Sequence, residues 1–259
     1  MTLRHLITAA ILILGPGVTH ATTLLYNAAD EFIAGPTAQS ATNQWQYFQG
    51  NETRSVMTLL GDWDTNGNEV FSTDPQWDQN GGPNPNFNYP FVQKTSPGPA
   101  SGNFGATISG DALIIHPGWQ GDGVDTVVAV GWYNNTGYTV SLDFSAIFTL
   151  EEGQNSNGIE YFVQRGLAGD GRFLSLTNSI LAGGTQDAWA IASATGIELL
   201  AGEMLYVGID NNGSYEWDHT RLDLDISATF DDSPSAVPMP APLALLGLGL
   251  VALRRFRKG

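Results

Sequence analysis

The chain has 259 residues, with 10 Lys and Arg against 26 Asp and Glu, which gives a formal net charge of −16. We expect no nucleic-acid partner for such an acidic chain, because binding to phosphates requires clustered cations. The chain contains no cysteine, so disulfides, thiolate metal sites and cysteine nucleophiles are excluded.

The N-terminal residues 1–21 have the order of a secretory signal peptide. Arg4 gives a positive start, and an apolar run over 6–14 is too short to span a bilayer. A Gly-Pro-Gly break and the small residue Ala21 follow, as expected before a cleavage site. We therefore predict an exported body that covers residues 22–233.

Alternation of apolar and polar residues is the main structural signal in that body. Residues 138–144 and 222–230 alternate with period two, which places one set of side chains in a core and the other in solvent. Further predicted strands lie at 23–26, 45–48, 55–60, 104–108, 113–116, 126–133, 159–164, 173–177, 188–191, 197–200 and 204–210. Many short strands separated by Gly, Asn and Asp predict an all-β fold, an antiparallel β-sandwich of jelly-roll type.

One stretch, residues 61–103, is rich in Gly, Asn, Asp and Pro and is predicted to be a single long loop. It opens with the pattern D-x-D-x-N-G, which is typical of calcium loops because alternate oxygen ligands converge on the ion. The candidate metal ligands are Asp62, Asp64, Asn66, Asn68 and Glu69. The twelfth position is Thr73 instead of the usual Glu, so an Asx-rich turn without an ion is the alternative.

Aromatic residues in turn-like contexts form a candidate carbohydrate platform. They are Trp63, Trp77, Trp119, Tyr215 and Trp217. Exposed indoles stack on the apolar faces of sugar rings, while neighbouring Asn and Asp bond the hydroxyls; the alternative is that these rings cover the edge of the core. Trp45, Trp132 and Trp189 lie in predicted strands, so we assign them to the core.

Signals of catalysis are weak, and we predict no catalytic residues. The body has only two histidines, His116 and His219, and it has neither a G-x-S-x-G elbow nor a Gly-Lys phosphate loop. Its many acids leave a glycosidase pair open, for example Glu151 or Glu152 with Glu160.

The C-terminal segment 234–259 joins a proline motif, an apolar run over 243–253 and a basic end. The motif residues are Val237, Pro238, Met239, Pro240 and Ala241, and the basic end begins with Arg254 and Arg255. The cations are expected to stay on the cytoplasmic side of the inner membrane, which places the body outside.

This three-part order resembles the PEP-CTERM class of bacterial sorting signals, in its VPLPA variant with Met239 in place of Leu. The resemblance implies processing by an exosortase-type enzyme, transient anchoring in the inner membrane and export in a bacterium that makes exopolysaccharide. A plain membrane anchor is the alternative.

Residues 104–230 are similar to jelly-roll modules of exported bacterial proteins, which are related in appearance to carbohydrate-binding modules. The resemblance rests on His116-Pro117-Gly118 and on the segment 201–210, and it implies a fold more than a ligand. Together these signals predict an exported, non-enzymatic protein of the cell surface or extracellular matrix that binds polysaccharide, with calcium-stabilised loops. An extracellular glycan hydrolase or lyase and a purely structural matrix component are the alternatives.

Overall fold

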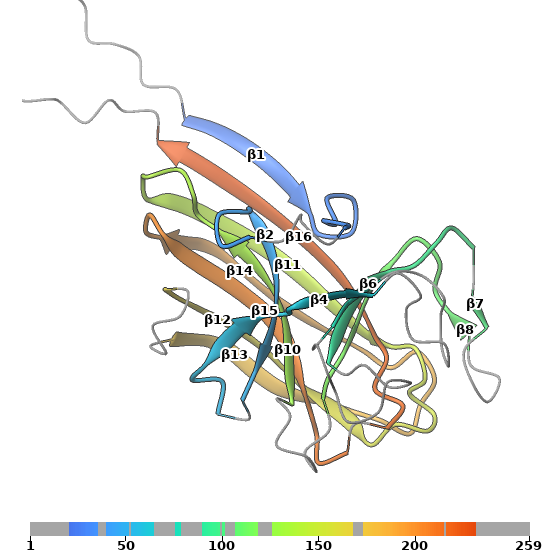
Figure 1. The fold of residues 1–259 in the computed structure, drawn as a ribbon. Helices are drawn as coiled ribbons and strands as arrows, with labels where there is room; N and C mark the ends of the chain where they lie inside the picture. Colours follow the sequence, from blue (N-terminus) through green and yellow to red (C-terminus); the bar gives the residue numbers. More distant parts are fainter. Residues whose placement is uncertain are drawn as a thin grey trace, which may run out of the picture. The chain divides into compact units, whose positions relative to one another are not determined.

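In the residues that the computed structural model describes, the regular secondary structure consists of β-strands (Figure 1). The described residues are 21–35, 40–51, 53–64, 76–78, 90–98, 100–101, 107–118, 126–167, 173–214 and 216–231. Within these ranges no helix is long and apolar enough to cross a membrane. The predicted signal peptide, apart from Ala21, and the sorting segment lie outside them.

The larger sheet, sheet A, has eight strands and is antiparallel at each pairing for which the register is resolved. Its order is β14 (Trp189–Leu199), β11 (Val140–Leu150), β16 (Thr220–Asp231), β9 (Leu113–His116), β6 (Phe91–Lys94), β5 (Gln76–Asp78) and β4 (Asp62–Asp64). The eighth strand, β1 (Ala21–Asn27), pairs with β16 and lies alongside it in Figure 1.

The second sheet, sheet B, has six strands and is antiparallel at each resolved pairing. Its order is β13 (Phe173–Ala182), β12 (Gly158–Leu167), β15 (Glu203–Asn211), β10 (Val127–Tyr133), β2 (Trp45–Gly50) and β3 (Met57–Leu59). A separate short pair joins β7 (Ala100–Ser101) to β8 (Thr107–Ile108).

The main core contains side chains from both sheets. The even-numbered residues of β11 and the apolar even-numbered residues of β16 up to Ala228 are buried in it, as the alternation predicts. Trp45 and Trp132 are also buried there, so their predicted core positions are confirmed. The predicted all-β antiparallel sandwich is confirmed in its sheet architecture, and residues Thr23–Phe230 form one compact unit.

A second apolar cluster is formed by side chains of sheet B. It comprises Phe48, Met57, Val127, Ala129, Phe162, Met204 and Tyr206. Arg54 borders this cluster: its guanidinium lies 4.6 Å from the centroid of the Phe162 ring and pairs with Glu160 at 2.7 Å. Sheet B is thus buried on both faces around these residues.

Two details of the predicted strand pattern are wrong. The stretch 61–103 is not one loop, because β4, β5, β6 and β7 lie within it, and the first three of these belong to sheet A. Strands of two to four residues are too short to display a period. In addition, the two strands predicted at 188–191 and 197–200 are a single strand, β14, whose register against β11 shifts between Leu142 and Phe144.

Candidate functional site

The outward face of sheet A is polar and contains one strongly exposed aromatic side chain. Because side chains alternate along a strand, the odd-numbered residues of β11 and β16 point away from the core. The outward residues are Ser141, Asp143, Ser145, Ile147 and Thr149 on β11, Arg221, Asp223, Asp225, Ser227 and Thr229 on β16, and Trp189, Ile191 and Ser193 on β14. We refer to this set as the outward face.

Trp189 is 63% exposed, so its predicted place in the core is wrong. Trp189 is the first residue of β14, which is an edge strand of sheet A. Its side chain points to the same face of the sheet as that of Ile191, which is 49% exposed. In the strand register Trp189 lies beside Thr149, and Thr149 lies beside Arg221. The indole therefore begins a row of side chains that crosses three strands.

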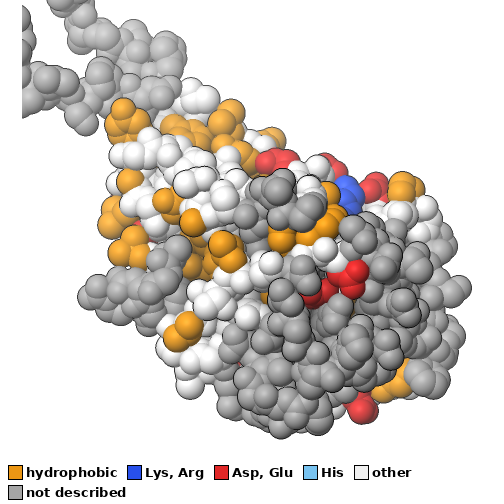
Figure 2. Space-filling model, viewed as in Figure 1, with side chains coloured by type: hydrophobic (Ala, Val, Ile, Leu, Met, Phe, Trp, Pro, Cys, Tyr) orange, Lys and Arg blue, Asp and Glu red, His pale blue; other side chains and the backbone are white. Residues whose placement is uncertain are grey.

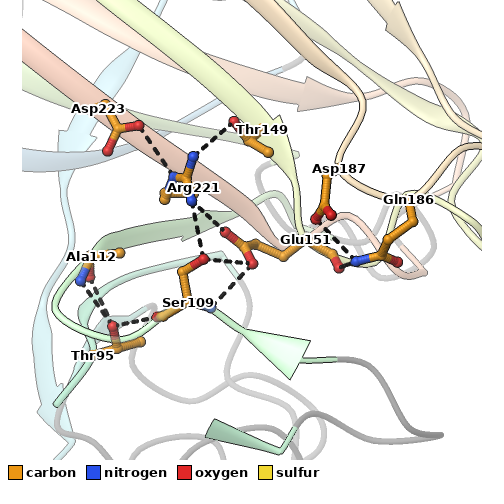
Figure 3. Close-up of polar contacts among 9 residues, drawn as sticks. All are labelled: Thr95, Ser109, Ala112, Thr149, Glu151, Gln186, Asp187, Arg221 and Asp223. Atoms are coloured by element: carbon orange, nitrogen blue, oxygen red, sulfur yellow. Dashed lines mark hydrogen bonds and ion pairs between the residues drawn. The ribbon is translucent and has the colours of Figure 1, made fainter. Parts of the chain in front are cut away.

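Arg221 fixes the polar end of that row (Figure 3). Its Nε donates to Asp223 Oδ2 at 3.2 Å, and its two terminal nitrogens donate to Ser109 Oγ at 3.1 Å and Thr149 Oγ1 at 3.5 Å. Glu151 Oε1 lies 3.6 Å from the same guanidinium. These partners hold the guanidinium in one orientation while about a third of the side chain (32%) stays exposed.

Glu151 joins this row to the turn that precedes Trp189. Burial raises the pKa of Glu151, and hydrogen bonds from the Ser109 hydroxyl and amide, both 3.1 Å from Oε2, act in the opposite direction, as does the Arg221 charge. The backbone carbonyl of Glu151 accepts a hydrogen bond from Gln186 Nε2 at 2.6 Å. The network therefore connects Arg221 and Glu151 to the turn that leads into Trp189 (Figure 3).

A shallow depression of about 300 Å³ continues the outward face toward β1. It is lined by Leu25, Tyr26, Asp143, Phe144, Ser145, Asp225, Ile226 and Ser227. Asp143 Oδ1 accepts from the Gly196 amide at 2.8 Å, and Asp225 Oδ1 accepts from Asn27 Nδ2 at 2.8 Å. Both aspartates are exposed, so each carboxylate presents a further oxygen to solvent.

The outward face is long enough for an extended ligand. From the Trp189 row to the Asp143 row there are six residues along β11, or about 20 Å at a rise of about 3.3 Å per residue. An indole and Ile147 offer apolar contact at one end, and carboxylates and hydroxyls accept and donate hydrogen bonds along the rest. Sugar rings present apolar C–H faces and hydroxyls, which match this arrangement.

Two of the predicted platform residues pack together in the interior. Trp77 is 3% exposed, and its Nε1 donates to the Ile33 carbonyl at 2.7 Å. Trp63 is half-buried against it, with ring centroids 5.2 Å apart. These two indoles cover the core edge, which is the alternative that the sequence left open for them.

The structure does not place the other predicted platform residues next to Trp63 and Trp77. Trp217 is half-buried with a positive φ of 67°, in the turn before β16. Trp119 and Tyr215 lie outside the described residues.

The predicted calcium ligands are only partly described. Asp62 and Asp64 lie on β4, opposite Asp78 and Gln76 of β5. Asn66, Asn68 and Glu69 lie outside the described residues. Among the residues that the structure describes, no group of three His, Asp or Glu side chains is arranged to hold a metal ion.

A buried cluster of ionisable groups lies where β16 begins. His219 Nδ1 is 2.7 Å from Glu152 Oε2, and Ser156 Oγ donates to Asp218 Oδ1 at 2.5 Å. Burial raises the pKa of Glu152 to about 7 and that of Asp218 to about 8, and it lowers the pKa of His219 to about 3.

The same cluster includes His116, whose ring centroid is 4.5 Å from that of His219 and whose pKa burial holds well below its usual range. Glu152 and Asp218 are 0% exposed and His219 is 1% exposed. Ser156 bonds to Asp218 and not to His219, so the groups do not form a relay from serine to histidine to acid. The cluster ties the turn 151–156 to β16.

Comparisons with known proteins give only distant likenesses. A scan against protein-family models finds no match, and a search of curated proteins finds none. Among solved structures, the K2 adhesin domain of Lys-gingipain is 13% identical, with 80% of this chain and 98% of that chain covered and a TM-score of 0.35.

Two further solved structures have names that mention carbohydrate. A family 16 carbohydrate-binding module is 12% identical, with 53% and 85% of the two chains covered and a TM-score of 0.22. An α-L-arabinofuranosidase is 17% identical, with 56% of this chain but 23% of that chain covered and a TM-score of 0.34. The adhesin domain and the carbohydrate-binding module have sheet-rich folds, as this chain has.

Proposed function

We propose that this chain is an exported, non-enzymatic protein of the cell surface or extracellular matrix that binds polysaccharide through the outward face of sheet A. The observation that carries the proposal is Trp189, an indole that is 63% exposed on a sheet face that also presents hydroxyls, carboxylates and the apolar side chains of Ile147 and Ile191. A large exposed aromatic side chain beside hydrogen-bonding groups is typical of a binding surface.

The two ends of the chain support the exported location. The sequence order in residues 1–21 is that of a signal peptide, and the order in 234–259 is that of a PEP-CTERM-like sorting signal. In this proposal an exosortase-type enzyme processes the chain near Pro238 while the C-terminal apolar run anchors it transiently in the inner membrane.

The negative charge of the protein determines whether neutral or acidic polysaccharides can bind directly. Figure 2 shows hydrophobic and acidic side chains on the visible face and little Lys or Arg, in line with the net charge of −16. An acidic polymer would be repelled unless divalent cations bridged it to the protein. We therefore propose neutral polysaccharides as direct ligands and acidic ones as ligands that require calcium.

The state of the carboxylates supports binding over hydrolysis. Hydrolysis needs two carboxyl groups that reach the glycosidic bond from opposite sides. Glu151 and Glu152 are 2% and 0% exposed, and Glu160 lies on the other sheet in an ion pair with Arg54. Asp143 and Asp225 are accessible, but they line an open depression on one sheet face.

The proposal is tested by affinity electrophoresis of residues 22–233 in gels that contain neutral or acidic polysaccharides. We expect Trp189→Ala to weaken retention by about tenfold, because loss of a stacking ring costs about 1.4 kcal/mol or more. Trp189→Phe should retain part of the binding. The matched control is Tyr138→Ala, since Tyr138 is a 70% exposed aromatic residue outside the outward face.

Equal retention of wild type and Trp189→Ala would contradict the proposed site. A chain that binds no polysaccharide would favour the purely structural matrix role, and release of new reducing ends or unsaturated products from the polymer would favour the hydrolase or lyase.

A further inference from the structure

The two sheets end on one side of the sandwich in long edge strands, each of which is interrupted by one register shift against its neighbour. In the described part of the chain β14 and β13 each pair on one side only, and they are 11 and 10 residues long. Natural edge strands are usually short, charged or interrupted by proline. The opposite edges, β3 and β4, are three residues each. By contrast, β13 and β14 contain no proline and one ionisable side chain, Glu198.

The core is also less completely covered on this side. Ala190, Ala194 and Ile197 of β14 pack against the main core but are only partly buried. Inward residues of the neighbouring strands, such as Phe148 of β11 and Leu224 of β16, are 0% and 1% exposed. Apolar surface therefore remains open along the β14 edge.

The straight part of β14 is the segment 189–194. It pairs residue for residue with Thr149 to Phe144 of β11, and the register shifts immediately beyond it. Farther along, Arg165 of β12 donates to the Glu198 carbonyl and so occupies the backbone there. The straight segment carries no charge, and it exposes Trp189 and Ile191.

We propose that two copies of this chain associate by antiparallel pairing of their β14 edges over residues 189–193, with Ile191 opposite Ile191 of the second copy. The unpaired N–H and C=O groups of an edge strand fit another extended strand, and an antiparallel pair of identical segments is self-complementary. The charge distribution favours a second copy of this chain as the partner of the β14 edge. Two copies with a net charge of −16 repel each other least where they meet through a segment that carries no charge, and residues 189–194 carry none.

This association has a consequence for the shape of the binding surface. A two-fold axis perpendicular to the paired sheets leaves both outward faces on the same side, so the two Trp189 rows become parts of one continuous face. If each face binds polysaccharide, one polymer could engage both copies with increased avidity. The pairing itself does not depend on polysaccharide binding.

Sedimentation velocity of the full-length chain over a range of concentrations tests the pairing. We expect a monomer–dimer equilibrium that Ile191→Glu weakens by about tenfold or more, because two like charges would meet in the interface. The matched control is Leu25→Glu: Leu25 is 80% exposed on β1, and the variant adds the same charge away from β14. A monomer at all concentrations, or equal effects of both variants, would overturn the proposal.

Cysteine cross-linking gives a second test that does not depend on the stability of the charged variant. The chain has no cysteine, so a single introduced thiol reports unambiguously on contacts between copies. We expect Ile191→Cys, which lies opposite its own copy, to form a disulfide dimer under mild oxidation. Ser193→Cys, which lies opposite Trp189 of the second copy, and Ser141→Cys on the interior strand β11 should remain monomeric. Absence of a cross-link at position 191, or equal cross-linking at Ser193 or Ser141, would overturn the pairing.

Discussion

At the scale of single residues, burial determines which acids keep their protons. Asp218 is 0% exposed and accepts a hydrogen bond from Ser156 at 2.5 Å, and burial raises its pKa from 3.8 to about 8. The folded protein therefore holds a proton that the unfolded chain releases above about pH 4. The stabilising contribution of this proton is complete below pH 4 and is lost as the pH rises through about 8.

We predict that Asp218→Asn makes the protein more stable at pH 8 than the wild type, by on the order of 1 kcal/mol or more, because the raised pKa of Asp218 makes its ionisation costly in the folded state. The amide still accepts from Ser156 and has no proton to lose. Denaturant unfolding of both proteins at a series of pH values between 4 and 8 measures the difference.

The difference between the two proteins largely removes the contribution of His219, whereas Glu152, whose charge raises the pKa of Asp218, contributes to the difference as part of the pair. Glu152, with its pKa raised to about 7, changes stability in the same direction as Asp218, whereas His219, with its pKa lowered to about 3, gives stability that rises from pH 3 to 6.5. Both groups are present in wild type and variant. A difference between the two proteins that does not change with pH would contradict the assigned titration of Asp218.

The pair of Arg221 and Glu151 provides a second prediction for single residues. Arg221→Gln should destabilise the fold by about 1–2 kcal/mol, because it removes the cation from a carboxylate that is 2% exposed. Adding Glu151→Gln should restore part of the loss, since the buried group is then neutral. A double-mutant cycle of unfolding free energies measures this, and strict additivity would show that the two side chains do not interact.

Sequence patterns place residues well only when one face of a strand is clearly apolar. In β11 and β16 large apolar and polar residues alternate, so both faces could be predicted. In β14 the inward positions include Ala190, Ala192 and Ala194, which are smaller than the outward Trp189 and Ile191. Its place in a predicted strand assigned Trp189 to the core, but the strand pattern does not show which face is inward, so the exposed indole on which the candidate site depends was missed.

At the scale of elements, two glycines shape the central strands of sheet B. A Cβ at Gly208 of β15 would lie 2.3 Å from the Val128 carbonyl oxygen and 2.6 Å from the Phe162 ring. A Cβ at Gly131 of β10 would lie 2.7 Å from the Phe48 ring. Large rings of the second apolar cluster thus pack directly on the backbone of neighbouring strands, where only glycine leaves room.

We predict that Gly208→Ala destabilises the fold by about 1–3 kcal/mol, the usual cost of overpacking. Gly61→Ala is the matched control, because nothing lies within 4 Å of a Cβ at this exposed position. Thermal and denaturant unfolding measure both variants. Equal stability of the two would contradict the close packing over Gly208.

The sheet content could be predicted from the sequence more readily than the extent of individual strands. The alternating segment 222–230 and two short apolar runs predicted β16, β9 and β10 close to their observed bounds, whereas the alternation over 138–144 predicted only the first half of β11. The three-residue strands β4 and β5 were missed because their pairing depends on partners that are distant in sequence. The break predicted near 192–196 is a change of register within one strand, and local composition alone cannot distinguish it from a turn.

At the scale of the whole molecule, the net charge of −16 makes bound cations favourable. We predict that excess chelator lowers the melting temperature of residues 22–233 and that calcium restores it. The double variant Asp62→Asn/Asp64→Asn should lose this response. Scanning calorimetry with and without EDTA measures the effect. An unchanged melting temperature of the wild type in excess EDTA would show that calcium does not stabilise the fold.

The central claim is that polysaccharide binds on the outward face of sheet A at Trp189. NMR of the indole N–H groups tests it directly: the chain has seven tryptophans, and Trp189→Phe identifies the signal of interest. On titration with a polysaccharide retained in affinity gels, we predict that the Trp189 signal shifts progressively while those of the buried Trp45 and Trp132 stay in place. Saturable binding that leaves the Trp189 signal unmoved would contradict the account.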